Sequence, residues 1–207
     1  MQTRDHLALG YFLLDLAGSE RLLKHSRAFL LGCVEPDYNP ATYLRGMRTG
    51  QKFRGHHAEN SFAHVSKCMA ELQREGLRTS WDYFTLGTVL HYAADAFTWP
   101  HNTFWESSLA GHVAYERKLH PVFSDELLRE FPDACPAEPH ALAAFFAGNH
   151  QAYAAAPHEM ETDSRYIIGV CGGLLLGSLR CAAAVFEEER SWRGAISYAG
   201  SYHHGLV

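Results

Sequence analysis

The sequence lacks an excess of positive charge. It has 18 Lys and Arg residues against 23 Asp and Glu residues, which gives a formal net charge of -5 at pH 7. A general nucleic-acid-binding protein needs a basic face, because binding displaces the counterions that surround the phosphates. The charge balance therefore argues against a stable nucleic-acid partner.

Cysteine is scarce, and its spacing does not suggest a disulfide framework. The chain has five cysteines, an odd number, and none of them forms a C-x-x-C pair. The N-terminus also lacks the apolar run of a signal peptide, since Arg4, Asp5 and His6 interrupt it. We therefore expect a cytoplasmic protein in a reducing compartment, with free and mostly buried thiols. The cysteines are Cys33, Cys68, Cys135, Cys171 and Cys181.

Long apolar runs and strand patterns are also missing. The segment from Tyr166 to Leu179 is apolar, but Arg180 ends it short of the roughly 20 residues that a membrane span needs. We expect a buried central helix there and no transmembrane segment. The sequence has no sustained apolar/polar alternation and no internal repeat. It also has no G-x-S-x-G elbow, Walker motif or dinucleotide fingerprint.

Helical periodicity runs along most of the chain. It predicts an all-α protein, one domain spanning residues 1–207 and built as a multi-helix bundle. Between the second and third helices, the prolines of VEPDYNP predict a loop that carries Asp37. Capping residues, Gly and Pro predict helices over residues 4–17, 20–31, 59–75, from Ser80 to before Pro100, from Ser107 or Ser108 to Pro121, and over 124–131, 140–156 and 162–189.

Histidine is abundant, with 14 residues, and several of them lie in one short stretch from Ser80 to Glu116. Two His/carboxylate pairs there are spaced four residues apart, which places each pair on one helix face, one turn apart. A His and a carboxylate so placed can close on one cation. The candidates are His91 with Asp95, His112 with Glu116, and His101, which follows Pro100 in a turn.

A simpler interpretation of each pair is a helix salt bridge, because that has the same spacing. Two pairs in one stretch with His101 between them favour a metal site instead. Asp95 lies in the apolar segment HYAADAF, where a carboxylate is destabilising unless it is paired or bound to a metal. A structural network of Asp95 with Arg or His remains the alternative. His120 continues the same helical stripe and is a weaker candidate.

These motifs resemble the zinc-dependent phospholipase C family, which is related to the S1/P1 nucleases. HYAADAFTWPH resembles the family's helix-and-turn motif, and HVAYE resembles its His-x-x-x-Glu motif. VEPDYNP, GHHAEN and DHLALG resemble three further ligand-bearing segments, in the family's order. The resemblance covers about residues 1–120. It implies the all-α fold of the phospholipase C/P1 nuclease type.

The resemblance also implies two or three Zn²⁺ ions per chain. In secreted members of the family, the N-terminal residue supplies its amino group and carbonyl to the third metal, and here Met1 lies five residues before His6. A third site is therefore either filled by other ligands or missing. His57 is an alternative to His56. The implied ligands are Asp37, His56, His91 and Asp95 for the first ion, His101, His112 and Glu116 for the second, and His6 with a bridging Asp95 for the third.

The implied activity is hydrolysis of a phosphodiester or phospholipid by a zinc-activated water, whose pKa falls from near 16 to about 7. Asp37 is the candidate for orienting or deprotonating that water, because it is expected on a loop. The basic residues near it contact a substrate phosphate or, in the interpretation we prefer, are solvated loop charges; they are Arg45, Arg48 and Arg54. The aromatic residues near His101 line an apolar cleft or, in the interpretation we prefer, belong to the core; they are Phe97, Trp99, Phe104 and Trp105.

Three alternatives stay open from the sequence. A nuclease-like phosphodiesterase would use the same metals, although the net charge of -5 counts against it. A non-catalytic helical module would use zinc only for stability, in closed four-ligand sites. Mn²⁺ or Fe²⁺ would accept the same ligand set as Zn²⁺.

Overall fold

The computed structural model describes residues 1–44, 56–105, 108–128, 138 and 141–201. It confirms the all-α prediction, since the described residues form helices and no strand. The α-helices are α1 (Thr3–Ala17), α2 (Glu20–Lys24), α3 (Ser26–Tyr38), α4 (Ala58–Glu75), α5 (Ser80–Ala96), α6 (Leu109–Leu127), α7 (Leu142–Ala154) and α8 (Met160–Ser201); two short 3-10 helices are η1 (Pro40–Leu44) and η3 (Trp99–His101).

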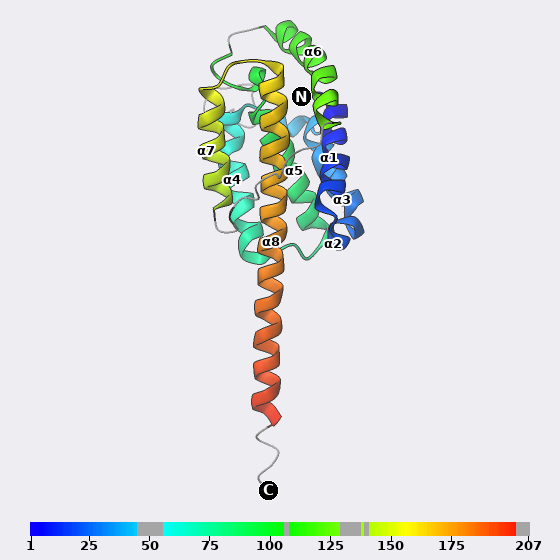
Figure 1. Cartoon of the computed structure of the whole chain (residues 1–207), viewed down its shortest axis with the longest axis vertical. Helices are drawn as coiled ribbons and strands as arrows, with labels where there is room; N and C mark the ends of the chain where they lie inside the picture. Colours follow the sequence, from blue (N-terminus) through cyan, green and yellow to red (C-terminus); the bar gives the residue numbers. More distant parts are fainter. Residues whose placement is uncertain (45–55, 106–107, 129–137, 139–140, 202–207) are drawn as a thin grey trace.

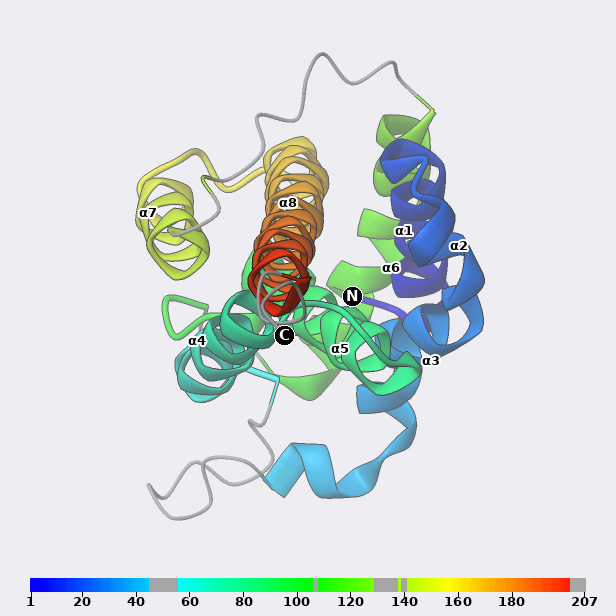
Figure 2. The ribbon, with the colours of Figure 1, turned by 90° about the horizontal axis from the view of Figure 1, so that it is seen from below.

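The helices are arranged around α8, which runs through the middle of the bundle (Figure 1). It packs against α1, α4, α5, α6 and α7. Seen from below, α4 and α7 lie on one side of α8, and α1, α3 and α6 lie on the other (Figure 2). Buried aliphatic and aromatic side chains fill the space between the helices, among them Phe29, Leu90, Phe123 and Leu174. The C-terminal part of α8 extends beyond the other helices (Figure 1).

Glycines allow α3 and α5 to pack closely. A β-carbon built on Gly32 would lie 2.1 Å from the backbone oxygen of Phe84, and one on Gly87 would lie 2.2 Å from the backbone oxygen of Phe29. Side-chain carbons do not approach other atoms so closely, so only glycine fits at either position. The close contact brings the end of α3, with Asp37, against the middle of α5, with His91.

The predicted loop around Asp37 is wrong, because α3 continues through Pro36 to Tyr38. Proline lacks an N–H and removes one hydrogen bond from a helix. Here it falls in the last turn of α3, where the tight packing on α5 compensates for that loss. Asp37 is therefore held by a helix end rather than by a loop. A loop position therefore gives no support to Asp37 as a base; the side chains around it do that instead.

Other helix boundaries differ from the prediction for related reasons. Pro121 does not close α6, which continues to Leu127 and absorbs much of the helix expected over residues 124–131. The N-cap of α5 is Thr79 rather than Ser80, because Thr79 and Asp82 form a capping box. Ser108 caps α6, as expected. The last helix runs beyond residue 189 to Ser201.

By length and composition alone, α8 is apolar enough over Met160–Glu187 to cross a membrane. However, 67% of its most apolar window is buried inside the protein. A core helix of a globular protein passes the same test, so the helix is weak support for a membrane span. Its central position agrees with the expected buried central helix.

Candidate metal centre

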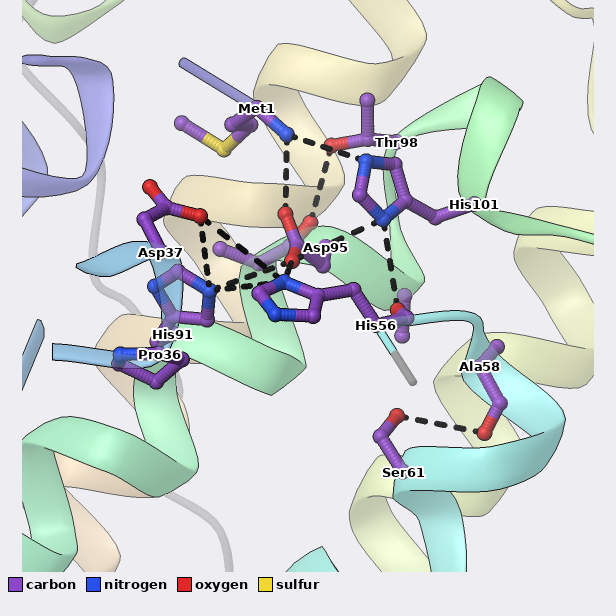
Figure 3. Close-up of polar contacts among 12 residues, drawn as sticks. Met1, Pro36, Asp37, His56, Ala58, Ser61, His91, Asp95, Thr98 and His101 are labelled. Atoms are coloured by element: carbon purple, nitrogen blue, oxygen red, sulfur yellow. Dashed lines mark hydrogen bonds and ion pairs between the residues drawn. The ribbon is translucent and has the colours of Figure 1, made fainter. Parts of the chain in front are cut away.

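Asp95 lies at the centre of a buried cluster of imidazoles and carboxylates (Figure 3). It projects from α5 one turn after His91, and their side chains are 3.3 Å apart, between Nε2 and Oδ2. The same Oδ2 lies 3.0 Å from Nδ1 of His56, and Oδ1 lies 3.2 Å from Nε2 of His6. Segments far apart in the sequence therefore meet at one carboxylate.

His6, His91 and Asp95 form the first group whose ligand atoms could share one ion. The His6 ring stacks on the His91 ring with centroids 3.8 Å apart. His6 is almost fully buried; its Nε2 faces Asp95, and neither ring nitrogen has hydrogen-bond geometry to a described residue. Buried polar atoms normally make good hydrogen bonds, so this imidazole beside a carboxylate fits a metal ligand.

Asp37, His56 and His91 form a second group. Oδ1 of Asp37 lies 3.9 Å from Nδ1 of His56 and 3.7 Å from Nε2 of His91. The two imidazole nitrogens are 3.3 Å apart. His57 is not in this group; it lines the neighbouring cavity, with its ring 6.0 Å from that of His101. The geometry therefore favours His56 over His57.

His101, His112 and Glu116 form a third group, on η3 and α6. Oε1 of Glu116 lies 3.0 Å from Nε2 of His112 and 3.2 Å from Nε2 of His101. His112 and Glu116 lie one turn apart on α6, as their spacing predicts. The His101 ring also approaches Asp95, at 3.6 Å, and so connects this group to the other two.

The spacing of these atoms fits zinc. Zinc binds His nitrogen and carboxylate oxygen at about 2.0–2.2 Å, so two ligands of a tetrahedral ion lie about 3.3 Å apart. The closest separations between ligand atoms in the three groups are 3.0–3.3 Å, and those to Asp37 are 3.7–3.9 Å. Neutral imidazole and carboxylate are also the donors that zinc takes. The residues therefore fit the metal.

Hydrogen bonds outside the cluster orient two of its imidazoles. Nδ1 of His91 lies 2.8 Å from the carbonyl oxygen of Cys33, to which it can only donate. Nε2 of His56 lies 3.1 Å from Oγ1 of Thr42, whose hydroxyl donates to the carbonyl of Pro36 or Asn39. Each bond holds the ring so that its other nitrogen faces Asp95, the orientation in which an outer partner fixes a metal-binding histidine.

Electrostatics keep His6, His101 and Asp95 in the forms that bind cations, whereas His91 is shifted the other way. Burial lowers the pKa of His6 and of His101 to about 4, which favours neutral imidazoles at neutral pH. Burial alone would raise the pKa of Asp95, but nearby His101, the α-amino group of Met1 and His91 outweigh it and hold that pKa well below its ordinary value. At His91 burial is likewise outweighed, by Asp95 and Asp37, and its pKa is raised.

The α-amino group of Met1 also lies in the centre. Its nitrogen is 2.9 Å from Oδ1 of Asp95 and 3.4 Å from Nε2 of His101 (Figure 3). It is also 3.0 Å from Oε1 of Glu116. Burial alone would lower the pKa of this group, but the two carboxylates raise it to about 11. The ammonium thus stands where a cation between the two carboxylates would lie.

The centre opens into a cavity of about 580 Å³. Asp37, His56, His101, His112 and Glu116 line it, so potential ligands of the second and third groups are accessible from the cavity. Apolar side chains of Pro100, Trp105, Leu109 and Val113 line another part of its wall. A buried cluster of cation ligands with an open cavity beside it is suited to binding and transforming a substrate.

A family model described as zinc-dependent phospholipase C matches residues 5–160 of the chain. The chain belongs to this family. No curated protein and no solved structure gave a significant match. Membership makes the chain a zinc-dependent, phospholipase C-like hydrolase domain in the coarse sense, and the groups around Asp95 are its candidate metal ligands.

In this phospholipase C-like chain, all eight residues expected at the metals converge on the centre, and Asp37 is the one whose backbone setting differed from expectation. Of the aromatic candidates, Trp105 lines the cavity and Phe97 is buried in the core. Arg45, Arg48, Arg54 and Cys135 lie outside the described residues. The other cysteines are buried, as expected.

Two sets of contacts at the edge of the centre were not predicted: the bond between His120 and Asp5, and the contacts of Asp163. His120 belongs to none of the three groups; its Nδ1 bonds to the buried carboxylate of Asp5 instead. Asp163 on α8 contacts the segments that carry His101 and Glu116. Neither Asp5 nor Asp163 has a ligand-like spacing in the sequence. Asp163 also lies beyond the motifs and beyond the family match, so only the three-dimensional arrangement identifies it.

Proposed function

We propose that the chain hydrolyses phosphodiesters of phospholipids at a centre of two or three zinc ions. The observation that carries the proposal is the arrangement around Asp95, where three ligand groups lie side by side, two of them share His91, and two of them line one cavity. A single closed four-ligand site would suit a structural zinc instead. Shared ligands and an accessible cavity are typical of catalytic metal centres.

The residues that would hold the ions follow the three groups. Zinc bound there supplies Lewis acidity, which lowers the pKa of a water to about 7 and offsets the charge of phosphate oxygens. The side chains themselves position the substrate phosphate against that charge. The proposed ligands are Asp37, His56, His91 and Asp95 for one ion, His101, His112 and Glu116 for another, and His6 with Asp95 for a third.

We assign Asp37 the role of orienting and deprotonating the attacking water. Its carboxylate lines the cavity, and its Oδ1 faces His56 and His91 at 3.9 and 3.7 Å. Its Oδ2 accepts no hydrogen bond from any described residue. Because the residue lines the cavity beside two imidazoles, its carboxylate is placed near a water bound there, as a general base needs to be.

The cavity favours a phospholipid over a nucleic acid. Among its described lining residues none is Lys or Arg, so the cavity has no row of basic side chains to follow a polyanionic backbone. The apolar wall formed by Pro100, Trp105, Leu109 and Val113 suits the glycerol and acyl part of a lipid. Leu109 is 80% exposed at the rim, where it can contact the lipid phase.

Zinc analysis and a phosphodiesterase assay test the proposal together. Purified protein, dialysed against zinc and then against buffer, should retain two or three zinc ions and hydrolyse a chromogenic choline phosphodiester and phospholipid vesicles. His91→Ala should lose both metal and turnover, whereas His25→Ala, a histidine bonded to Ser80 outside the cavity, should retain both. Bound zinc without turnover on either substrate would support the structural-module alternative.

A further inference from the structure

Asp163 is a fully buried carboxylate that the metal centre itself does not use. It lies in the first turn of α8 and is 0% exposed. Its Oδ2 accepts hydrogen bonds from the backbone N–H of Trp99 at 3.0 Å and from the hydroxyl of Tyr115 at 2.9 Å. Its Oδ1 accepts one from the hydroxyl of Tyr153 at 2.7 Å. One side chain thus connects η3, α6 and α7 to α8.

Two of these donors adjoin potential metal ligands. Trp99 is the first residue of η3, two residues before His101, and Tyr115 directly precedes Glu116 on α6. The same oxygen, Oδ2, accepts both bonds. It therefore fixes the distance between η3 and α6, which carry His101 and Glu116 with their ligand atoms 3.2 Å apart.

The turn that carries His101 is held from both sides. After His101, the side chain of Asn102 donates to the carbonyls of Ala96 and Thr98, and Glu59 accepts from Thr103. Before His101, the contact that the structure gives the N–H of Trp99 is the one with Asp163. Loss of that contact would leave a partly buried donor without its acceptor at the start of the turn, which destabilises the native arrangement.

The burial of Asp163 is itself destabilising. Desolvation raises the pKa of this carboxyl to about 6, although the bonds from Trp99, Tyr153 and Tyr115 partly oppose the shift. Helix packing alone does not require an acid at such a position, since an apolar side chain would fill it at no electrostatic cost. A carboxylate is required where three donors from three segments must converge.

We propose that Asp163 is a positioning residue for the His101, His112 and Glu116 half of the metal centre. It holds η3 and α6 at the separation at which the imidazole of His101 and the carboxylate of Glu116 bind the same ion. The proposal rests on that group being a metal site, as in the proposed function. The third arm, to Tyr153 on α7, contacts neither ligand-bearing segment and is structural only.

The difference between the arms supplies the controls. Asp163→Asn replaces one acceptor oxygen by a donor, and Tyr115→Phe removes only the arm to α6. Tyr153→Phe removes the same kind of phenol from the same carboxylate, but on the side away from the ligands. Zinc affinity is measured for each variant by competition with a chromogenic chelator. The unfolding temperature of each metal-free protein is measured alongside it.

Asp163→Asn and Tyr115→Phe should each lower the affinity for one zinc ion by roughly 10-fold or more, the usual effect of removing a residue that orients a ligand. Tyr153→Phe should keep wild-type zinc affinity while lowering the unfolding temperature at least as much as Tyr115→Phe does. The inference is overturned if Tyr153→Phe and Tyr115→Phe weaken zinc equally, or if neither Tyr115→Phe nor Asp163→Asn weakens it. If Asp163→Asn does not fold, the two tyrosine variants decide between these outcomes. A wild-type chain that binds no zinc would instead contradict the proposed function.

Discussion

Gly32 on α3 and Gly87 on α5 face each other at a contact that has no room for a β-carbon. A β-carbon on Gly87 would lie 2.9 Å from the backbone nitrogen of Cys33 and 3.1 Å from the carbonyl carbon of Gly32. This contact places Cys33, whose carbonyl orients His91, and Asp37 beside the ligands of α5. The geometry of the candidate metal centre therefore depends on two glycines that bind no metal themselves.

Gly87→Ala should destabilise the metal-free protein by about 1–3 kcal/mol, because the added methyl forces two backbones apart. It should also weaken zinc binding, since α3 carries Asp37. Gly148→Ala is the matched control: it lies in α7 with nothing within 4 Å of the added carbon, and alanine is the better helix former. Urea unfolding in chelator gives the free energy of unfolding of each metal-free variant. Equal stability of the two variants would show that the α3/α5 contact is not tight.

Removal of single ligands should reveal which are shared. His91 belongs to two of the ligand groups, whereas His112 belongs to one. His91→Ala should therefore lower the zinc content by more ions per chain than His112→Ala, and abolish turnover. Metal analysis of dialysed protein gives the count. Equal losses for both variants would contradict the sharing of His91.

Asp37→Asn tests the proposed base. An amide oxygen can still approach a cation but cannot take a proton, so kcat should fall by roughly 10²–10⁴-fold. The acidic limb of the pH–rate profile should change as well, while zinc bound at the His101, His112 and Glu116 group should stay. An unchanged kcat on the chromogenic phosphodiester would remove Asp37 from the role of base.

The pKa of Asp163 predicts a pH-dependent difference between the wild type and Asp163→Asn. The folded-state pKa is raised from 3.8 to about 6, so the folded protein favours the protonated acid. The stability that this gives is complete below about pH 4 and is lost as the pH rises to about 6. The groups facing Asp163, Tyr115 and Tyr153, have raised pKa values and stay neutral throughout.

The variant lacks this titration and should gain stability relative to the wild type between pH 4 and pH 6, on top of a constant loss of hydrogen bonds. Two pKa units correspond to about 2–3 kcal/mol. Unfolding in chelator at pH 4, 5, 6 and 7 measures the difference. A difference that is constant over this range, or that moves in the wild type's favour, would contradict the raised pKa.

Leu109 tests the phospholipid assignment. Leu109→Ser removes an apolar side chain from the cavity rim and should raise KM for phospholipid vesicles several-fold, with little effect on a small water-soluble phosphodiester. Leu128→Ser is the control, because Leu128 is 86% exposed at the end of the same helix and does not line the cavity. Parallel losses on both substrates for Leu109→Ser would contradict a lipid contact there.

The sequence predicted two His/carboxylate pairs because their signal is local, whereas His6, Asp37 and His56 were expected only from the family resemblance. The spacing of His91 and Asp95, and of His112 and Glu116, survives in the structure because helix periodicity fixes it. The all-α fold followed from the same periodicity. Proline misled the prediction twice, at Pro36 and Pro121, since α3 and α6 continue through residues that usually end a helix.

Residues whose role depends on distant partners could not be predicted in this way. Asp163 acts through donors 64 and 48 residues away, on Trp99 and Tyr115. Gly32 and Gly87 matter only because α3 packs on α5. Such contacts follow from the folded arrangement, and no spacing rule encodes them. The single-domain and cytoplasmic assignments stay predictions from the sequence.

Anomalous diffraction at the zinc absorption edge, on crystals grown with zinc, tests the central claim most directly. We predict two or three peaks between the side chains of Asp95, His91 and Glu116, each about 2.0–2.2 Å from its His nitrogen or carboxylate oxygen. The side chains of His6, Asp37 and His101 should also lie within coordination distance of a peak. Crystals without a peak within coordination distance of Asp95, in which these imidazoles and carboxylates bond only to one another and to water, would contradict the account.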